Sequence, residues 1–133
     1  MHIDNYSLRY SQGVELLAEG HNWDLHNFAV FVGCHHDPVG RTCSFTWVAL
    51  LVENPWGDPG NTARGCILEF SGVSAFVHEP GIGADKETLS EISDIPQGEE
   101  GWSERDAFDL WLRFEDGTVY KLRAERSRLL AVK

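Results

Sequence analysis

The stretch Ala107-Phe-Asp-Leu-Trp-Leu-Arg-Phe-Glu-Asp-Gly-Thr-Val-Tyr-Lys-Leu-Arg-Ala124 alternates apolar and polar residues on both sides of an Asp-Gly pair. Because strand side chains alternate between two faces, its apolar residues share one face of each arm, with Trp111 as the exception on the polar face. Asp116-Gly117 fits a two-residue turn in which both central residues have positive φ. The stretch therefore predicts a β-hairpin with one buried face.

The rest of the chain repeats this strand signature between clusters of turn-forming residues. Apolar, β-branched and aromatic residues predict further strands over 6–10, 14–18, 25–33, 42–53, 64–71, 73–78, 89–95 and 129–132. A short helix over 12–19, closed by Gly20, is the alternative for the second of these. Many short strands without a long amphipathic helix indicate an all-β fold. We expect one domain over residues 1–133, an antiparallel β-sandwich or partly open barrel of about 8–10 strands.

Three positions shape this expected fold. The segment 42–53 is apolar on both faces from Trp47 onward, which predicts a central strand. Gly72 interrupts two strands, and its missing side chain allows the chain to kink from one sheet to the other. Residues 35–40 contain Pro38 and Gly40, which predict a turn.

The formal net charge of −10 is unevenly distributed. Residues 85–109 contain nine acids and two bases, and residues 110–133 contain six bases and three acids. An acidic protein of this kind is unsuited to nonspecific binding of nucleic acid or of anionic membranes. These charges are either solvated faces of one domain or an acidic docking surface for a basic protein partner.

Trp102 lies within the acidic segment, in an expected loop. A large aromatic anchor surrounded by carboxylates combines desolvated contact area with electrostatic steering. The candidate partner-binding residues are Glu91, Asp94, Glu99, Glu100, Trp102 and Glu104.

Cys34, Cys43 and Cys66 are odd in number and have no C-x-x-C spacing, so they indicate neither a disulfide framework nor a zinc ribbon. The strand parity of Cys43 with Phe45 and Trp47 predicts reduced core thiols. The first residues show neither the basic nor the apolar region of a signal peptide, and no apolar run approaches transmembrane length. A cytoplasmic protein is expected, and nothing in the sequence indicates its oligomeric state.

His35, His36 and Asp37 combine imidazole and carboxylate groups that suit a metal ion, and His21, His26 or His78 could supply a further ligand. The spacing is not diagnostic. If the segment is a strand, His35 and His36 point to opposite faces, and the alternative is a set of turn residues that bind local backbone groups. No sequence motif calls for a cofactor, because neither a P-loop nor a dinucleotide fingerprint is present.

Trp56 lies in the expected loop over 54–61. A large aromatic in such a position either covers the edge of the core or binds a ligand such as a sugar ring. Trp56 is therefore the candidate residue of a small-ligand or carbohydrate-binding sandwich.

Three sequence segments occur together in this chain: His36-Asp37 after an early strand, Leu68-Glu-Phe-Ser-Gly-Val73, and Leu112-Arg-Phe-Glu-Asp-Gly117. In these the chain resembles small acidic β-rich bacterial proteins of unassigned function, some of which are grouped with the immunity proteins of polymorphic toxin systems. The resemblance implies a protein that binds and neutralises a partner. It implies no catalytic residues.

The leading functional hypothesis is a non-enzymatic binding protein that uses its acidic surface to hold a basic protein. A small-ligand or carbohydrate-binding sandwich is the second hypothesis. A metal-dependent enzyme using His35 or His36 with Asp37 is the third.

Overall fold

In the computed structural model, which describes residues 1–96, 98 and 103–133, the chain is all-β. Thirteen strands lie within these described residues. They are β1 (His2–Ile3), β2 (Tyr6–Leu8), β3 (Gln12–Gly13), β4 (Glu15–Ala18), β5 (His21–Asp24), β6 (Ala29–Asp37), β7 (Thr42–Ala49), β8 (Gly65–Ser71), β9 (Ala75–Glu79), β10 (Leu89–Ser93), β11 (Leu110–Phe114), β12 (Val119–Arg123) and β13 (Arg126–Val132). The all-β prediction is confirmed, although the strands are more numerous and shorter than expected.

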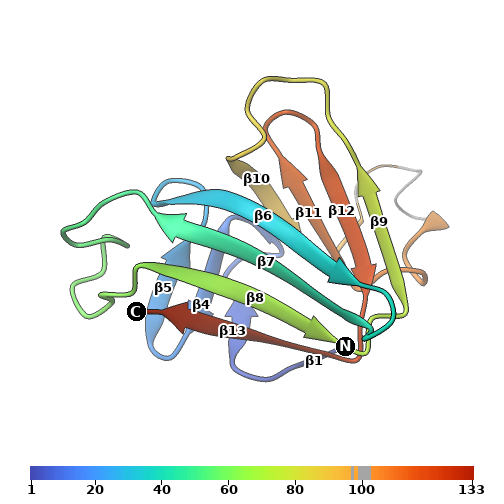
Figure 1. Cartoon of the computed structure of the whole chain (residues 1–133), viewed down its shortest axis with the longest axis horizontal. Helices are drawn as coiled ribbons and strands as arrows, with labels where there is room; N and C mark the ends of the chain where they lie inside the picture. The colour runs from blue at the N-terminus through green and yellow to red at the C-terminus, as the bar shows by residue number, and fades with distance from the viewer. Residues whose placement is uncertain (97, 99–102) are drawn as a thin grey trace.

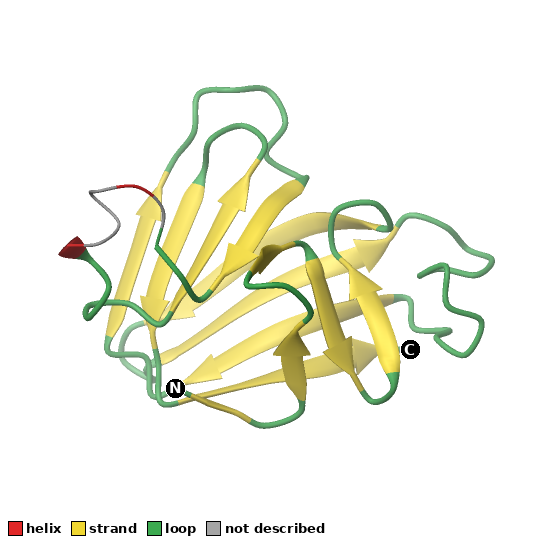
Figure 2. Ribbon diagram, turned by 180° about the vertical axis from the view of Figure 1, so that it is seen from behind, coloured by secondary structure: helices red, strands yellow, loops and turns green. Residues whose placement is uncertain are grey.

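The strands form three sheets. A long sheet has the order β1-β13-β8-β7-β6, a hairpin sheet has the order β3-β10-β11-β12-β9, and an N-terminal sheet has the order β2-β4-β5. The long sheet crosses the front of the molecule, and the other two sheets lie behind it (Figure 1). From behind, the hairpin sheet and the N-terminal sheet lie next to each other against the same face of the long sheet (Figure 2). The arrangement is a sandwich and not a closed barrel.

The predicted C-terminal hairpin consists of β11 and β12, which pair from Leu110 with Leu122 to Arg113 with Val119. Its apolar face joins the common core through Leu110, Leu112 and Phe114. Trp111, the expected exception, faces the opposite side of the sheet but is also buried. Both faces of this strand are therefore covered.

The turn of this hairpin differs from the prediction. The amide of Gly117 donates to the carbonyl of Phe114, and the amide of Phe114 donates to the carbonyl of Thr118, so three residues form the loop. Gly117 has φ 93°, whereas Asp116 keeps a negative φ. This pattern is a type I turn followed by one left-handed residue, the usual three-residue hairpin connection. The prediction of a two-residue turn was wrong because the Asp116 carboxylate accepts hydrogen bonds from the amide and the hydroxyl of Thr118.

Several strand boundaries also differ from the prediction. The expected loop before residue 25 contains β5, and the expected strand over 25–33 begins only at Ala29. Between them Asp24 accepts bonds from the amides of His26 and Asn27, which turns the chain. The expected long strand over 42–53 ends at Ala49, and β7 occupies the predicted central position between β6 and β8. Residues 12–19 form strands and not the alternative helix.

Gly72 lies where the chain passes from the long sheet to the hairpin sheet, as predicted. It separates β8 from β9, which belong to different sheets. Its φ is 64°, and a Cβ atom there would lie 2.6 Å from the Glu125 carboxylate. A glycine is therefore required both by the backbone and by the packing.

An aromatic cluster joins the long sheet to the hairpin sheet. The ring of Phe31 on β6 lies 4.6 Å from Phe114 and 6.1 Å from Tyr120, measured between ring centroids. Phe45 on β7 lies 5.1 Å from Tyr120 in an edge-to-face arrangement. Such ring pairs contribute about 0.5–1.5 kcal/mol each beyond the burial of their area.

The three-residue turn leads to a prediction for Gly117. Because its φ is 93° and a Cβ atom there would lie 3.8 Å from its nearest neighbour, Gly117→Ala introduces backbone strain without a steric clash. We expect a loss of about 1 kcal/mol in the free energy of unfolding for Ala and less for Asn, which tolerates left-handed geometry better. Urea unfolding of both variants measures this. Equal stability of wild type and Gly117→Ala would rule out the turn described.

Candidate functional site

His35, His36 and Asp37 lie on β6 and not in a turn, which begins only after Asp37. The strand sends neighbouring side chains to opposite faces. His35 is exposed on the outer face of the long sheet, while His36 faces inward and stacks on Phe76 with 4.1 Å between ring centroids. Asp37 accepts hydrogen bonds from the amides of Val39 and Gly40, as expected of a residue that shapes a turn.

His78 does not join these residues in a metal site. It stacks on Tyr120, with ring centroids 4.5 Å apart and planes 9° from parallel. Among the residues that the structure describes, no group of three or more His, Cys, Asp or Glu side chains could hold a metal ion. The geometry of the described residues therefore offers no support for the metal-dependent enzyme.

The predicted acidic surface is partly neutralised within the chain. Glu91 is largely buried on β10, with its Oε2 3.8 Å from Nε of Arg113. Burial raises the pKa of its carboxyl, although Arg113 acts in the opposite direction. Glu104 lies 2.8 Å from Nζ of Lys121, which also lies 2.9 Å from Glu79. Burial lowers the pKa of Lys121, but these two carboxylates outweigh that effect and raise it.

The remaining members of that surface have different positions. Asp94 is exposed beside the N-terminal strands, in a depression that also contains Met1 and Tyr6. Glu99, Glu100 and Trp102 lie outside the described residues. Their part in partner binding stays a prediction from the sequence.

Trp56 is buried and covers the edge of the core. Only 2% of its surface is exposed, its Nε1 donates to the carbonyl of Ala63, and its ring lies 4.9 Å from that of Trp23. Its ring face is therefore unavailable to a sugar in this conformation. This placement agrees with the interpretation of Trp56 as a core-covering residue.

A cleft of about 430 Å³ opens where the long sheet and the hairpin sheet separate. One wall comes from the edge strand β6, and the other from β9, β12 and the segment between β9 and β10. A β-bulge between Phe31 and Gly33 turns Val32 out of the strand pairing, and Val32 is 62% exposed beside the cleft. The lining residues are Phe31, Val32, Gly33, His78, Pro80, Gly81, Lys86, Glu87, Asp116, Thr118 and Tyr120.

Two loops form the rim of this cleft, and we call them the acidic rim: residues 80–88 and 115–118. The amide of Gly83 donates to the carbonyl of Asp116, and the amide of Glu115 donates to the carbonyl of Thr88. A Cβ atom on Gly81 would lie only 2.2 Å from the Asp116 carbonyl oxygen, so a glycine is needed for the two loops to approach. The rim is thus a joined unit.

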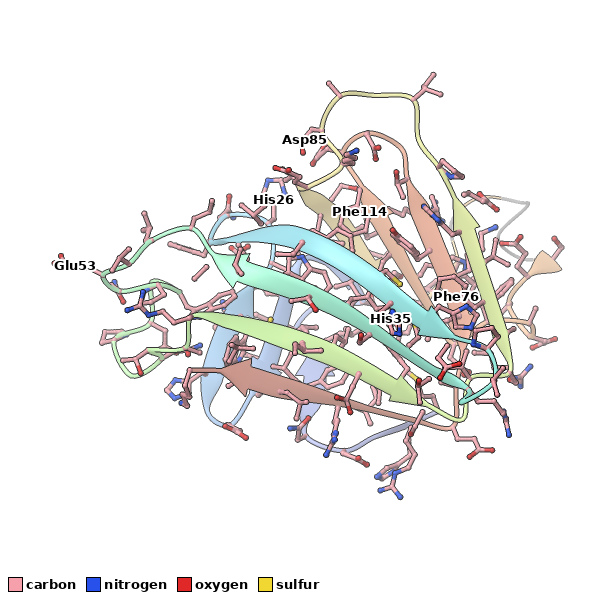
Figure 3. The ribbon with its side chains drawn as sticks, in the orientation of Figure 1. His26, His35, Glu53, Phe76, Asp85 and Phe114 are labelled. Atoms are coloured by element: carbon pink, nitrogen blue, oxygen red, sulfur yellow. The ribbon has the colours of Figure 1, made fainter. Side chains whose placement is uncertain are left out.

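The rim contains acids that have no Lys or Arg partner among the described residues. They are Asp85, Glu87, Glu115 and Asp116; Glu115 lies 3.8 Å from Nδ1 of His26, and Asp116 binds Thr118. Hydrogen bonds from Thr88 chiefly hold the pKa of Asp85 below its ordinary value. Figure 3 shows Asp85 and His26 at the same end of the molecule as Phe114, far from Glu53 on the opposite loop. Ile82 is fully exposed in the same loop as Asp85.

The sequence did not reveal this cleft, because its walls come from four separate segments. It did contain one signal, since Asp85 and Glu87 open the acidic segment. The cleft also has polar groups available for binding. No described residue forms a hydrogen bond with the Tyr120 hydroxyl or with the His78 ring, and both residues line the cleft.

The described residues contain no helix with the length and apolar character needed to cross a bilayer. Comparisons with protein-family models, with curated proteins and with solved structures find no match to this chain. The site must therefore be interpreted from its own geometry.

The buried hydroxyls of the chain predict its behaviour in alkali. Burial raises the pKa of Tyr6 and of Tyr120 to about 12. Because the folded protein holds these protons more tightly than the unfolded chain, their contribution to stability is complete below pH 10 and is lost as the pH rises toward 12. We expect the free energy of unfolding to fall across this interval, and to fall less in Tyr120→Phe. Urea unfolding at a series of pH values measures it, and an unchanged slope in the variant would contradict the burial of Tyr120.

Proposed function

We propose that this protein is a non-enzymatic binding protein whose partner is a basic protein. The observation that supports this proposal best is the partly apolar cleft at the acidic rim. A protein interface needs an anchoring pocket for a buried side chain and complementary charge around it. The cleft offers the first, and Asp85, Glu87 and Glu115 offer the second.

An arginine or lysine side chain of the partner suits this cleft. Its aliphatic portion packs against Phe31 and Val32, and a guanidinium packs against the exposed ring of His78. Glu87 then pairs with the cation. Lys86 is the only Lys or Arg among the described lining residues, so acids outnumber bases in the cleft and its rim.

The net charge of −10 supports the same partner over a longer distance. Opposite net charges accelerate encounter, and the local acids then determine orientation. Neutralisation of a basic toxin, as the resemblance to immunity proteins implies, is one form that such binding takes. We place the protein in the cytoplasm, on the basis of its three free thiols.

Charge reversal at the rim tests this proposal. The probe is a hexa-arginine peptide, and its affinity is measured by fluorescence anisotropy at low and at moderate salt. We expect the double variant Glu87→Lys/Glu115→Lys to weaken binding by about tenfold or more, because it removes the acids at the cleft. It should also flatten the salt dependence.

Two charge-matched variants are the controls. Glu19→Lys/Glu53→Lys changes the net charge equally at exposed positions away from the rim and should weaken binding by less than about threefold. Glu99→Lys/Glu100→Lys tests the acids predicted from the sequence alone. Equal losses of affinity in all three variants would show that only the net charge matters, and would contradict the acidic rim as the binding site. A wild-type protein that does not bind the peptide would contradict the proposed function.

The same cleft supports a second candidate, the binding of a small polar molecule. The Tyr120 hydroxyl and the His78 ring are available for hydrogen bonds within a volume typical of ligand sites. A panel of monosaccharides and small carboxylates tests this by thermal unfolding. A ligand should raise the unfolding midpoint of wild type and of Trp56→Phe, but not that of Tyr120→Phe. A panel without any effect, or an effect lost in Trp56→Phe alone, would exclude the cleft as a small-ligand site.

A further inference from the structure

Two of the three cysteines face each other across neighbouring strands. Cys34 on β6 pairs in register with Phe45, and Cys43 on β7 pairs with His36, so the cysteines are diagonal neighbours on the inner face of the long sheet. Their Sγ atoms lie 3.6 Å apart, and both are free thiols. A disulfide bond is about 2.05 Å long, so its formation requires the two side chains and their strands to move closer together.

The surroundings of the pair assign a different role to each thiol. Cys34 is half-buried on an edge strand, whereas Cys43 is 2% exposed. The hydrogen bond from the Cys43 thiol lowers the pKa of Cys34, and the same bond, together with burial, raises the pKa of Cys43. The more exposed cysteine of the pair is thus also the one with the lowered pKa, which is typical of an attacking cysteine beside a resolving one.

Cys66 provides an internal contrast. It lies on β8 between Trp47 and Ala131 in the sheet and has no exposed surface. Burial raises its pKa to about 12. A buried thiol that stays protonated reacts slowly with oxidants.

We propose that Cys34 and Cys43 are a redox site that forms a reversible cross-strand disulfide when the protein meets a hydroperoxide. The Cys34 thiolate attacks one oxygen of hydrogen peroxide, the O–O bond breaks, and hydroxide leaves; Cys34 becomes a sulfenic acid. The sulfur of Cys43 then attacks the sulfur of Cys34, the S–O bond breaks, and water leaves with the Cys43 proton. In total two thiols lose two protons and two electrons, and one peroxide gains them and becomes two waters.

The disulfide adjoins the cleft. Cys34 directly follows Phe31, Val32 and Gly33, the part of β6 that lines it, and charge on Cys34 also contributes to the raised pKa of Tyr120. Oxidation therefore ties this wall to β7. The redox site goes beyond the proposed binding function and does not depend on it.

Thiol mapping of the intact chain tests the proposal. Reduced protein is treated with hydrogen peroxide, quenched with a maleimide in denaturant and analysed by mass spectrometry. We expect the loss of two of the three maleimide-reactive thiols, a mass lower by two hydrogen atoms, and a peptide that links Cys34 to Cys43. Dithiothreitol should restore all three thiols.

Two conservative variants separate the roles. Cys66→Ser should form the same link as wild type, whereas Cys43→Ser should stop at a sulfenic acid on Cys34 that dimedone traps. The proposal is wrong if Cys34 and Cys43 both keep their maleimide reactivity, or if the link involves Cys66. The wild-type map decides this even if a variant folds poorly, and it requires no binding partner, so it is independent of the peptide experiment.

Discussion

The contact between the Phe31 ring and the rings of the hairpin sheet is the interaction on which the rest of this structure depends. Phe31 lies on the edge strand of the long sheet, packs against Trp47 of its own sheet, and meets Phe114 and Tyr120 across the sandwich. Its amide donates to the carbonyl of Glu87, so backbone and side chain both attach β6 to the opposite layer. Directly after Phe31 the bulge at Val32 separates the layers, and the cleft begins there.

The acids of the chain also fall into two groups: those paired with a Lys or Arg of the fold, and those of the acidic rim, which have no such partner among the described residues. On the outer face of the hairpin sheet, acids lie beside bases of the neighbouring strand, as Glu91 does with Arg113 and Glu79 with Lys121. Such pairs contribute little to stability when exposed, but they remove these acids from any docking surface. At the loops of the acidic rim no described Lys or Arg fulfils this role. The positions of the acids without a Lys or Arg partner therefore say more about where a basic protein binds than the net charge does.

Local sequence patterns predicted much of the fold. The alternation around residues 107–124 predicted the hairpin, Gly72 predicted the passage between sheets, and the parity of Cys43 with Phe45 and Trp47 predicted their burial. Each of these features depends on residues close together in the chain. The turn at Asp116 could not be predicted in the same way, since the side-chain bonds of Asp116 to Thr118 compete with the backbone preference for a two-residue turn.

The candidate site depends on contacts between segments far apart in the chain, so most of it could not be predicted from the sequence. The cleft needs the register of β6 against β7, with its bulge at Val32, and the approach of the two rim loops at Gly81. The thiol pair likewise depends on that register, because a shift of one residue moves Cys34 to the other face of the sheet. Nuclear Overhauser effects from the Phe31 ring protons in the reduced protein report directly on the packing that joins the two layers. Cross-peaks to the ring protons of both Phe114 and Tyr120 are expected, and cross-peaks only within the long sheet would contradict this packing.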